Sequence, residues 1–366
     1  MGRNSNESNA QQNLLQEVVE SPPAGHYSGD KPNLTLRGFV EEHLRQNPYC
    51  LAGDTYSVPA FNKPIETTKA TAAYNIHTYW SKKPHDAIRE YIRHYTKPGD
   101  LVLDPFSGSG GTALAALSEG RKAISIDRSP AATFITYNYS TLVDVEALDA
   151  AAARVLAGIA DVFQWLYETT CDKCGGKAKV THTVYSQRFK CPRCLAIIPL
   201  FECVETEGQT KAGKPKTIQV CPHCWESGNK EEISTRGENF GIVPVLVGCV
   251  CVSQCKKGTY SERKSNDPDP IKREQFIKQD RARLAEIEHG EIPYWYPEAD
   301  LASVIPYRML CKKDFRPSAA TRLSQFFTKR NLWAMAALRH QIVTSERMDP
   351  RVRQALLFAF TGFFWG

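Results

Sequence analysis

The fold of this chain is decided by the stretch Leu101-Val102-Leu103-Asp104-Pro105-Phe106-Ser107-Gly108-Ser109-Gly110-Gly111-Thr112. Three aliphatic residues lead into an acid, a proline and an aromatic residue, and a glycine-rich turn then runs into the helix-forming segment 113–117. This order predicts a buried strand, a tight loop and the start of a helix. In such an arrangement, backbone N–H groups face an anionic or polar ligand.

The residues on either side of this stretch predict an α/β fold. Before it, Pro84 suits the first turn of a helix whose apolar side chains recur with helical spacing, at Ile88, Tyr91, Ile92 and Tyr95. After it we expect further helices and a second strand, over 111–119, 122–127, 130–139 and 145–167. This alternation of helix and strand is typical of the start of a doubly wound sheet.

Composition limits the class of protein. At 366 residues the chain can hold two or three domains, and its formal net charge of +6 is a mild basic excess. Such a charge permits a nucleic-acid partner without requiring one. The N-terminus is polar, and the longest apolar run, 355–360, is too short to cross a membrane. We therefore expect a cytoplasmic protein with no membrane partner.

Two acids decide between the ligands that the loop could hold. Gly108, Gly110 and Ala113 fit the loose dinucleotide pattern, so a nicotinamide cofactor must be considered. Asp104, directly before the glycines, would repel a pyrophosphate but suits a cationic ligand such as S-adenosylmethionine. Asp127 ends the next predicted strand, where an acid can accept both ribose hydroxyls of an adenosine moiety.

The segment 104–112 closely resembles the S-adenosylmethionine-binding motif of the amino-methylating DNA methyltransferases, which modify adenine N6 or cytosine N4. That motif reads D-P-F-x-G-S-G-T, and this chain carries one more glycine before the threonine. The segment 77–85 resembles the family's preceding cofactor motif, an H…KP element that opens a helix. The resemblance covers roughly residues 74 to 140.

The resemblance implies a Rossmann-like methyltransferase core, incomplete in this chain, that binds S-adenosylmethionine. It also implies direct methyl transfer to an exocyclic amine of a flipped DNA base, with a restriction or defence-system protein as a further partner. The cofactor-binding residues that it implies are His77, Lys83, Pro84, Asp104, Pro105, Phe106, Ser107, Gly108, Ser109, Gly110, Thr112 and Asp127.

The catalytic loop of that family, [D/N/S]-P-P-[Y/F/W], is not found in the sequence. Ser21-Pro22-Pro23-Ala24 lacks the aromatic residue, and Asn47-Pro48-Tyr49 lacks the second proline and is more typical of a turn. The catalytic residues are therefore unknown. We expect the loop to lie beyond residue 366 of a longer protein, so that this chain alone is inactive.

Twelve cysteines, most of them in close pairs, indicate metal binding in a reducing compartment. Cys171-x-x-Cys174 is followed after sixteen residues by Cys191-x-x-Cys194, a spacing typical of a zinc ribbon with four thiolates on one ion. A second zinc site is expected to join Cys221 and Cys224 to a pair from the 249–255 region. We favour Cys251 and Cys255 over Cys249, with Cys203 as a substitute.

The sequence thus predicts four regions. They are an N-terminal extension over 1–72, partly disordered, and the cofactor-binding half of the core over 73–168. A zinc-ribbon insertion over 169–260 follows, and a basic, mainly helical segment over 261–366 leads back to the core.

Two kinds of surface could contact DNA, and two rival functions stay open. The basic segment 256–283 and a patch of Arg322, Lys329 and Arg330 are the candidate contacts. One rival is a methyltransferase that acts on RNA. The other is a zinc-ribbon nucleic-acid-binding protein with a vestigial methyltransferase core.

Overall fold

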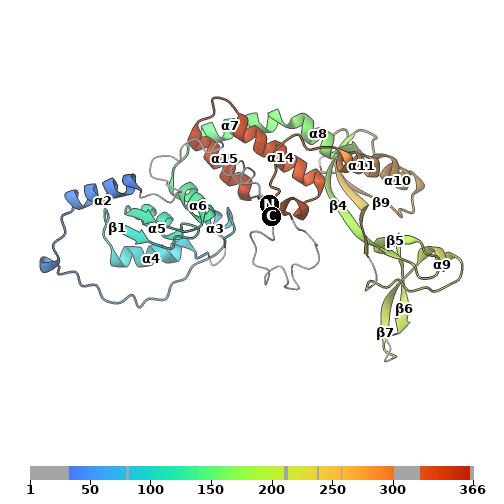
Figure 1. Ribbon diagram of the computed structural model, residues 1–366, viewed down its shortest axis with the longest axis horizontal. Coiled ribbons are helices and arrows are strands. Elements are labelled where there is room, and N and C mark those ends of the chain that lie inside the picture. Colours follow the sequence, from blue (N-terminus) through green and yellow to red (C-terminus); the bar gives the residue numbers. More distant parts are fainter. Residues whose placement is uncertain are drawn as a thin grey trace, which may run out of the picture. The chain divides into compact units, whose positions relative to one another are not determined.

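A pair of parallel strands forms the centre of the first part of the molecule. In the computed structural model, which describes residues 33–79, 82–209, 213–236, 239–256, 258–300 and 322–362, the chain divides into two units. Unit 1 comprises Met1–Gly158 with Leu338–Gly366, and unit 2 comprises Ile159–Ala337 (Figure 1). No helix within the described ranges is long and apolar enough to cross a membrane. Residues 1–32 of the N-terminal extension, which was predicted to be partly disordered, fall outside those ranges.

In unit 1, β1 (Leu101–Asp104) pairs in parallel with β2 (Lys122–Ser125). They are joined by α5 (Gly111–Ser118), and α6 (Pro130–Ser140) follows β2. The bounds of β1 agree with the sequence prediction, whereas β2 ends two residues before the predicted limit at 127. The helix predicted after Pro84 is α4 (His85–Tyr95).

The apolar contacts that hold these elements together are few and small. Ile92 of α4 is buried against Ala115 and Ala116 of α5, with Val102 of β1 and Ala123 of β2 packed around them. Alanine on this face of α5 lets α4 approach closely. Further elements precede this core: α2 (Leu34–Gln46), a 3-10 turn (Leu51–Gly53) and α3 (Ala72–Asn75).

The helix predicted over 145–167 is wrong as a single element. It is two helices, α7 (Val145–Gly158) and α8 (Ala160–Tyr167), and the division between the two units falls at the break. A Cβ at Gly158, the last residue of α7, would lie 2.4 Å from Nε2 of Gln341, so a larger residue there would displace that side chain. Unit 2 therefore begins ten residues before the boundary predicted at 168/169.

The end of the chain returns to unit 1. After α14 (Lys329–Thr344), α15 (Pro350–Gly362) packs against α6 and α7. Arg351 of α15 donates to Asn138 Oδ1 at 2.7 Å and to the carbonyl oxygen of Thr141 at 2.5 Å. These hydrogen bonds satisfy a side-chain oxygen and a carbonyl oxygen at the carboxyl end of α6, so α15 fastens that end of the helix.

In unit 2 the main sheet has the strand order β3-β4-β8-β9, all antiparallel, with the short β5 paired to β4. The strands are β3 (Glu168–Thr170), β4 (Lys177–Lys190), β5 (Ile197–Pro199), β8 (Asn239–Cys251) and β9 (Tyr260–Lys264). A separate hairpin, β6 (Val204–Gln209) with β7 (Pro215–Val220), precedes α9 (Pro222–Glu226). A 3-10 turn (Leu200–Glu202) precedes this hairpin.

Helices cover one face of the sheet. They are α10 (Pro270–Gln275), a π-helical turn (Phe276–Arg281) and α11 (Ala282–His289). Phe276, fully buried, packs on Val180 of β4 and Val247 of β8. The segment 261–366, predicted to be mainly helical, begins instead within the strand β9. A 3-10 turn (Leu323–Phe326) precedes α14.

A buried arginine joins the sheet to these helices. Arg263 of β9 has a side chain with no exposed surface, and its Nε donates to Asp280 Oδ2 at 2.7 Å. Its Nη1 donates to Asp172 Oδ1 at 2.6 Å, and that carboxylate lies between Cys171 and Cys174. The charge of Arg263 thus compensates two buried acids, Asp172 and Asp280, that are far apart in the sequence.

We predict that Arg263→Ala destabilises unit 2 by about 3–5 kcal/mol, because it leaves two buried carboxylates without a cation. Denaturant unfolding followed by fluorescence measures the loss. Lys264→Ala is the matched control, since the neighbouring side chain is 42% exposed and should change stability little. Equal stability of the two variants would contradict the structural role of Arg263.

Candidate cofactor loop and cysteine clusters

The glycine loop lies at the carboxyl ends of two neighbouring parallel strands. Asp104 is the last residue of β1 and pairs with Ser125, the last residue of β2. The N–H of Ser107 donates to the carbonyl oxygen of Ile126 at 2.9 Å, so the loop is bonded to the chain leaving β2. In open α/β sheets, the crevice outside the carboxyl ends of the strands is where ligands bind.

Asp127 holds the loop in place. Its Oδ2 accepts the N–H of Gly108 at 2.8 Å, and its Oδ1 accepts the N–H of Ser129 at 2.8 Å. One carboxylate thus fixes both the glycine loop and the first turn of α6. The resemblance implied a ribose contact for this residue, and each oxygen keeps a lone pair for such a bond.

Asp104 keeps much of its capacity to bind. Its Oδ1 accepts the N–H of Phe106 at 3.1 Å, which turns the chain after β1. Within the described residues, no cation forms an ion pair with this carboxylate. Phe106 itself is 87% exposed. A negative charge and an exposed aromatic ring therefore stand next to each other at the strand end.

Glycine is required at two positions of the loop. Gly110 has φ +76°, and a Cβ there would lie 2.8 Å from Cα of Thr136. Gly108 has φ +50°, and a Cβ there would lie 3.2 Å from the ring of Tyr79. The first glycine therefore allows α6 to approach the loop, and the second allows Tyr79 to lie against it. Both neighbours, Thr136 and Tyr79, were missed by the sequence prediction.

The structure places the other predicted loop residues as follows. Ser107 and Ser109 are buried, and the hydroxyl of Ser107 lies 3.4 Å from that of Thr136. Pro105 is exposed beside Phe106, and Thr112 lies in the first turn of α5. The extra glycine of this chain, Gly111, is the first residue of α5, where a Cβ would lie 3.2 Å from Ile88.

His77 is engaged by α15. Its Nδ1 lies 2.8 Å from the carbonyl oxygen of Thr78, and its Nε2 lies 3.1 Å from Oγ1 of Thr361. The ring is 8% exposed and stacks on Phe358 at a centroid distance of 5.3 Å. Both ring nitrogens thus have partners within the protein, and the cofactor contact of His77 stays a prediction.

Of two adjacent lysines, the structure engages the one that the prediction did not choose. Lys83 is exposed, and Pro84 precedes α4 as its N-cap. Lys82 instead donates through Nζ to the carbonyl oxygens of residues 73, 74 and 77, at 3.2, 2.8 and 3.2 Å. It also donates to the hydroxyl of Tyr139 at 2.8 Å and lies over that ring at 4.8 Å.

Lys82 therefore ties the segment that precedes Tyr79 to α6. Burial lowers the pKa of Lys82 to about 8, so at pH 7 the ammonium group is still mostly protonated. Nothing in the sequence distinguishes the two lysines, because both precede the proline and neither lies in a periodic pattern.

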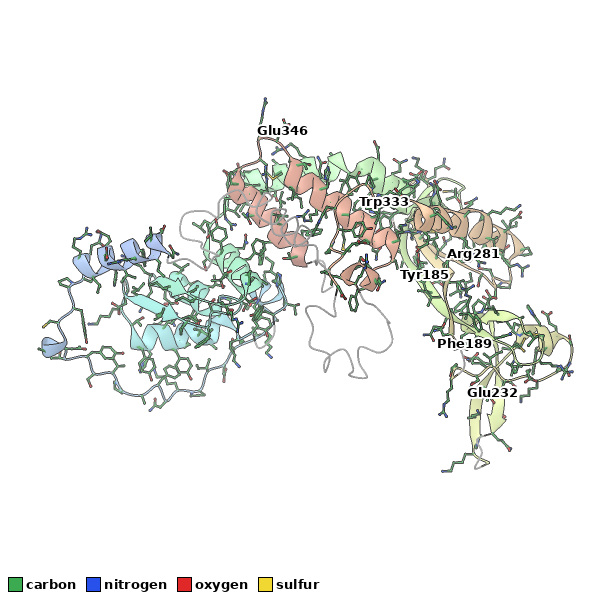
Figure 2. All side chains as sticks on the ribbon, in the orientation of Figure 1. Tyr185, Phe189, Glu232, Arg281, Trp333 and Glu346 are labelled. Atoms are coloured by element: carbon green, nitrogen blue, oxygen red, sulfur yellow. The ribbon has the colours of Figure 1, made fainter. Side chains whose placement is uncertain are left out.

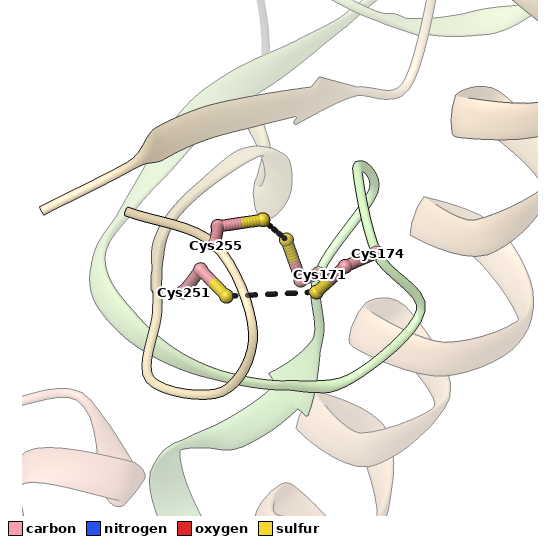
Figure 3. Close-up of side chains that lie close together, drawn as sticks. All are labelled: Cys171, Cys174, Cys251 and Cys255. Carbon is pink, nitrogen blue, oxygen red and sulfur yellow. Dashed lines mark hydrogen bonds between the residues drawn. The ribbon is translucent and has the colours of Figure 1, made fainter. Parts of the chain in front are cut away.

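The cysteines form two groups of four. We call Cys171, Cys174, Cys251 and Cys255 the proximal cluster (Figure 3). The four sulfur atoms lie within 4.8 Å of one another. The Sγ atoms of Cys171 and Cys255 are 3.8 Å apart, and those of Cys174 and Cys251 are 3.7 Å apart.

The second group, the distal cluster, has the same geometry and consists of Cys191, Cys194, Cys221 and Cys224. The Sγ atoms of Cys191 and Cys224 are 3.8 Å apart, and those of Cys194 and Cys221 are 3.6 Å apart. Phe189, Ile198 and Ile233 pack around this cluster and form a small apolar core.

The eight predicted cysteines are those of the two clusters, but the predicted pairing is wrong. We expected Cys174 and Cys191 on one ion, yet they lie at opposite ends of β4. A strand rises about 3.3 Å per residue, so fourteen residues separate the ends by roughly 40 Å. Figure 2 shows Tyr185 and Phe189 following each other along β4 towards the end of the unit that carries Glu232.

The return of β8 completes the proximal cluster. Cys251 at its end pairs with Ala178 near the start of β4, which brings it beside Cys171 and Cys174. Cys249 is buried nearby, but its Sγ lies 3.3 Å from Oγ of Ser261 rather than in the cluster. Burial raises the pKa of Cys203 to about 11, which keeps it a thiol outside either cluster.

The predicted surface patch of Arg322, Lys329 and Arg330 is wrong in one member. Arg330 is 6% exposed and donates through Nη1 to Oγ1 of Thr183 at 3.2 Å. Its guanidinium lies over the ring of Tyr167 at 5.5 Å. This arginine joins α14 to the sheet and does not face solvent.

Comparison with known proteins bears on the glycine loop. Residues 16–137 match the DNA methylase family, N6_N4_Mtase. The type II methyltransferase M1.MboII of Moraxella bovis is 48% identical over 50 residues, covering 14% of this chain and 19% of the relative. The type II methyltransferase M.Cfr9I of Citrobacter freundii is 39% identical over 70 residues, covering 19% and 23%.

A third relative, the DNA adenine methyltransferase YhdJ of Escherichia coli, is 43% identical over 47 residues, covering 13% of this chain and 16% of the relative. No solved structure matches the chain. The chain spans about a fifth of the length of these relatives. The matched segment, residues 16–137, is therefore similar to the N6/N4 amino-methyltransferase family.

We predict that Lys82→Met lowers the stability of unit 1 by about 2 kcal/mol, because it removes charge-assisted hydrogen bonds to several acceptors. It should also weaken cofactor binding, since Tyr79 is no longer held against Gly108. Thermal unfolding and calorimetric titration with S-adenosylmethionine measure the two effects. Lys83→Met is the control and should change neither. If Lys83→Met causes the larger loss of S-adenosylmethionine affinity, the sequence prediction for Lys83 is right and the role assigned to Lys82 is wrong.

Proposed function

We propose that this chain carries the cofactor-binding half of an S-adenosylmethionine-dependent DNA methyltransferase. The methyl group would be transferred to an exocyclic base amine, adenine N6 or cytosine N4. The observation that carries the proposal is the pair of acids, Asp104 and Asp127, at the carboxyl ends of β1 and β2 around the glycine loop. The DNA methylase family matches residues 16–137, which include both acids, and one relative is named a DNA adenine methyltransferase.

The residues of the loop fit a cationic nucleoside. Asp104 offers a carboxylate without an ion-pair partner in the described structure, which favours a ligand with a positive charge. Phe106 offers an exposed ring beside it for contact with an adenosine moiety. When bound, S-adenosylmethionine supplies an electrophilic methyl group. Asp127 would accept the ribose hydroxyls while it holds the N–H of Gly108.

The proposal includes DNA as the substrate and a restriction or defence-system protein as a partner. The matching DNA methylase family and the relative named DNA adenine methyltransferase favour DNA over RNA as the substrate. The reaction is one of positioning, in which an amine lone pair is held in line with the methyl group. The residues that hold the amine are not assigned by the described part of this chain.

We predict that Asp104→Asn weakens binding of S-adenosylmethionine about tenfold in calorimetric titration. The substitution removes the negative charge and keeps the oxygen that accepts the N–H of Phe106, so the turn should persist. Asp100→Asn is the matched control, because Asp100 also accepts a backbone N–H, that of Lys97, in the turn before β1.

Equal affinity in the two variants would remove Asp104 from the cofactor site. Absence of S-adenosylmethionine binding in the unmodified chain would contradict the proposed function. It would favour a zinc-containing nucleic-acid-binding protein with a vestigial core.

We propose further that each cysteine cluster holds one zinc ion. Four thiolates at Zn–S distances of about 2.3 Å form a tetrahedron with edges of about 3.8 Å. The four Sγ–Sγ separations of 3.6 to 3.8 Å fit that edge. Because all four positions would be filled by protein, the role is structural: each ion would fasten one end of the β4–β8 pair.

Paired substitutions test both the metal and the pairing. We predict that Cys171→Ser/Cys191→Ser removes a ligand from each cluster, so neither ion resists a competing chelator. Cys171→Ser/Cys251→Ser removes two ligands from the proximal cluster alone and should keep one zinc ion per chain. Atomic absorption after chelator treatment measures the content.

Which of the two variants keeps a zinc ion decides how the cysteine pairs are combined. If pairs consecutive in sequence shared an ion, the first variant would keep one zinc ion and the second would keep none. A metal-free unmodified chain would exclude zinc at both clusters.

A further inference from the structure

Leu195 has a backbone conformation that leucine rarely adopts. Its φ is +61°, and only one other non-glycine residue in the described part of the chain, Arg347, has a positive φ. The left-handed region brings Cβ close to the carbonyl oxygen and costs free energy for any residue but glycine. The leucine is also 60% exposed, so burial does not compensate that cost.

The proximal cluster contains the same turn with glycine in that place. The N–H of Cys171 donates to Gly176 O at 2.8 Å, and the N–H of Gly175 donates to Cys171 O at 2.9 Å. The corresponding bonds of the distal cluster join residue 191 to 196 at 2.9 Å, and 195 to 191 at 3.0 Å. Gly175, with φ +68°, is therefore the counterpart of Leu195. The fold of the turn does not require a side chain at this position.

The surroundings of Leu195 are apolar and positively charged. Ile197, two residues on, is 47% exposed and pairs across the strands with Lys190, which is also exposed. Arg193, inside the turn, is exposed as well. No ion pair engages either cation within the described residues. We call Lys190, Arg193, Leu195 and Ile197 the knuckle patch.

We propose that the knuckle patch is a contact surface for duplex DNA. The proposal rests on the proposed function only in its choice of substrate, and it concerns a part of the chain far in sequence from the cofactor loop. Two cations without acidic partners complement the phosphate backbone. An exposed aliphatic side chain flanked by cations is the arrangement with which proteins press an apolar wedge against base steps.

The strained leucine is what distinguishes this surface from ordinary exposed residues. A solvated turn would gain stability from glycine, as in the proximal cluster, and single exposed apolar residues alone carry no information. Leu195 has an unfavourable backbone conformation and an exposed side chain. Burial of that side chain against a partner would explain why leucine stands there.

Leu195→Gly tests the proposal, because it relieves the backbone and removes the wedge. In the zinc-loaded full chain, we expect an unfolding temperature equal to or above that of the unmodified chain. We also expect about tenfold weaker binding to a fluorescein-labelled mixed-sequence duplex, measured by anisotropy. A lower unfolding temperature, or unchanged DNA affinity, would overturn the proposal.

A charge variant provides the second readout. Arg193→Ala should lower the slope of log affinity against log salt by about 0.9, the effect of one phosphate contact. Lys173→Ala, at the corresponding position of the proximal turn, should leave the slope unchanged. Equal slopes for Arg193→Ala and the unmodified chain would remove the phosphate contact and overturn the assignment.

Further measurements distinguish this proposal from the proposed function. DNA binding is measured without S-adenosylmethionine, so loss of cofactor binding leaves the anisotropy result interpretable. If Leu195→Gly instead abolishes self-association in light scattering while DNA affinity stays the same, the patch is an interface between copies of the chain and the DNA assignment is wrong.

Discussion

The antiparallel pairing of β4 with β8 is the constraint on which unit 2 depends. It returns Cys251 to the first cysteine pair and keeps the second pair at the far end of a fourteen-residue strand. The same pairing places Val180 beside Val247 and so creates the surface on which Phe276 packs. The proximal cysteine cluster and the packing of the helices on the sheet both follow from this ladder of backbone hydrogen bonds.

The local structure of the cofactor segment could be predicted well from the sequence, and the arrangement of the cysteines could not. The strand 101–104 and the helices around it rest on nearest-neighbour effects: aliphatic runs, prolines and glycines. The pairing of cysteines depends instead on how far β4 extends. Its alternation of apolar and polar residues between Lys177 and Val180 is a signal that could have shown that two knuckles sixteen residues apart were separated by a strand.

Individual side chains near the loop show the same limit. The choice between Lys82 and Lys83 depends on where three carbonyl oxygens and a tyrosine of α6 lie, which no local pattern encodes. The role of Asp127 was predicted only in part. An acid at the end of β2 was recognisable, but its bond to the N–H of Gly108 follows from the position of the loop. The proposed cofactor contact and the observed structural contact would thus share one carboxylate.

The two cysteine clusters are nested in the sequence, because all four cysteines of the distal cluster lie between the two pairs of the proximal cluster. Cys191 and Cys224 of the inner pair are 33 residues apart, whereas Cys171 and Cys255 of the outer pair are 84 residues apart. During synthesis all four inner ligands emerge before the outer set is complete, and the shorter loop has the smaller closure entropy. The distal cluster would therefore assemble first. The proximal cluster would form afterwards, when the residues between its two cysteine pairs are already partly ordered. In a chain that is synthesised from its N-terminus, nested sites would assemble from the inner site to the outer one. Two consecutive sites would instead assemble in the order in which they occur in the sequence.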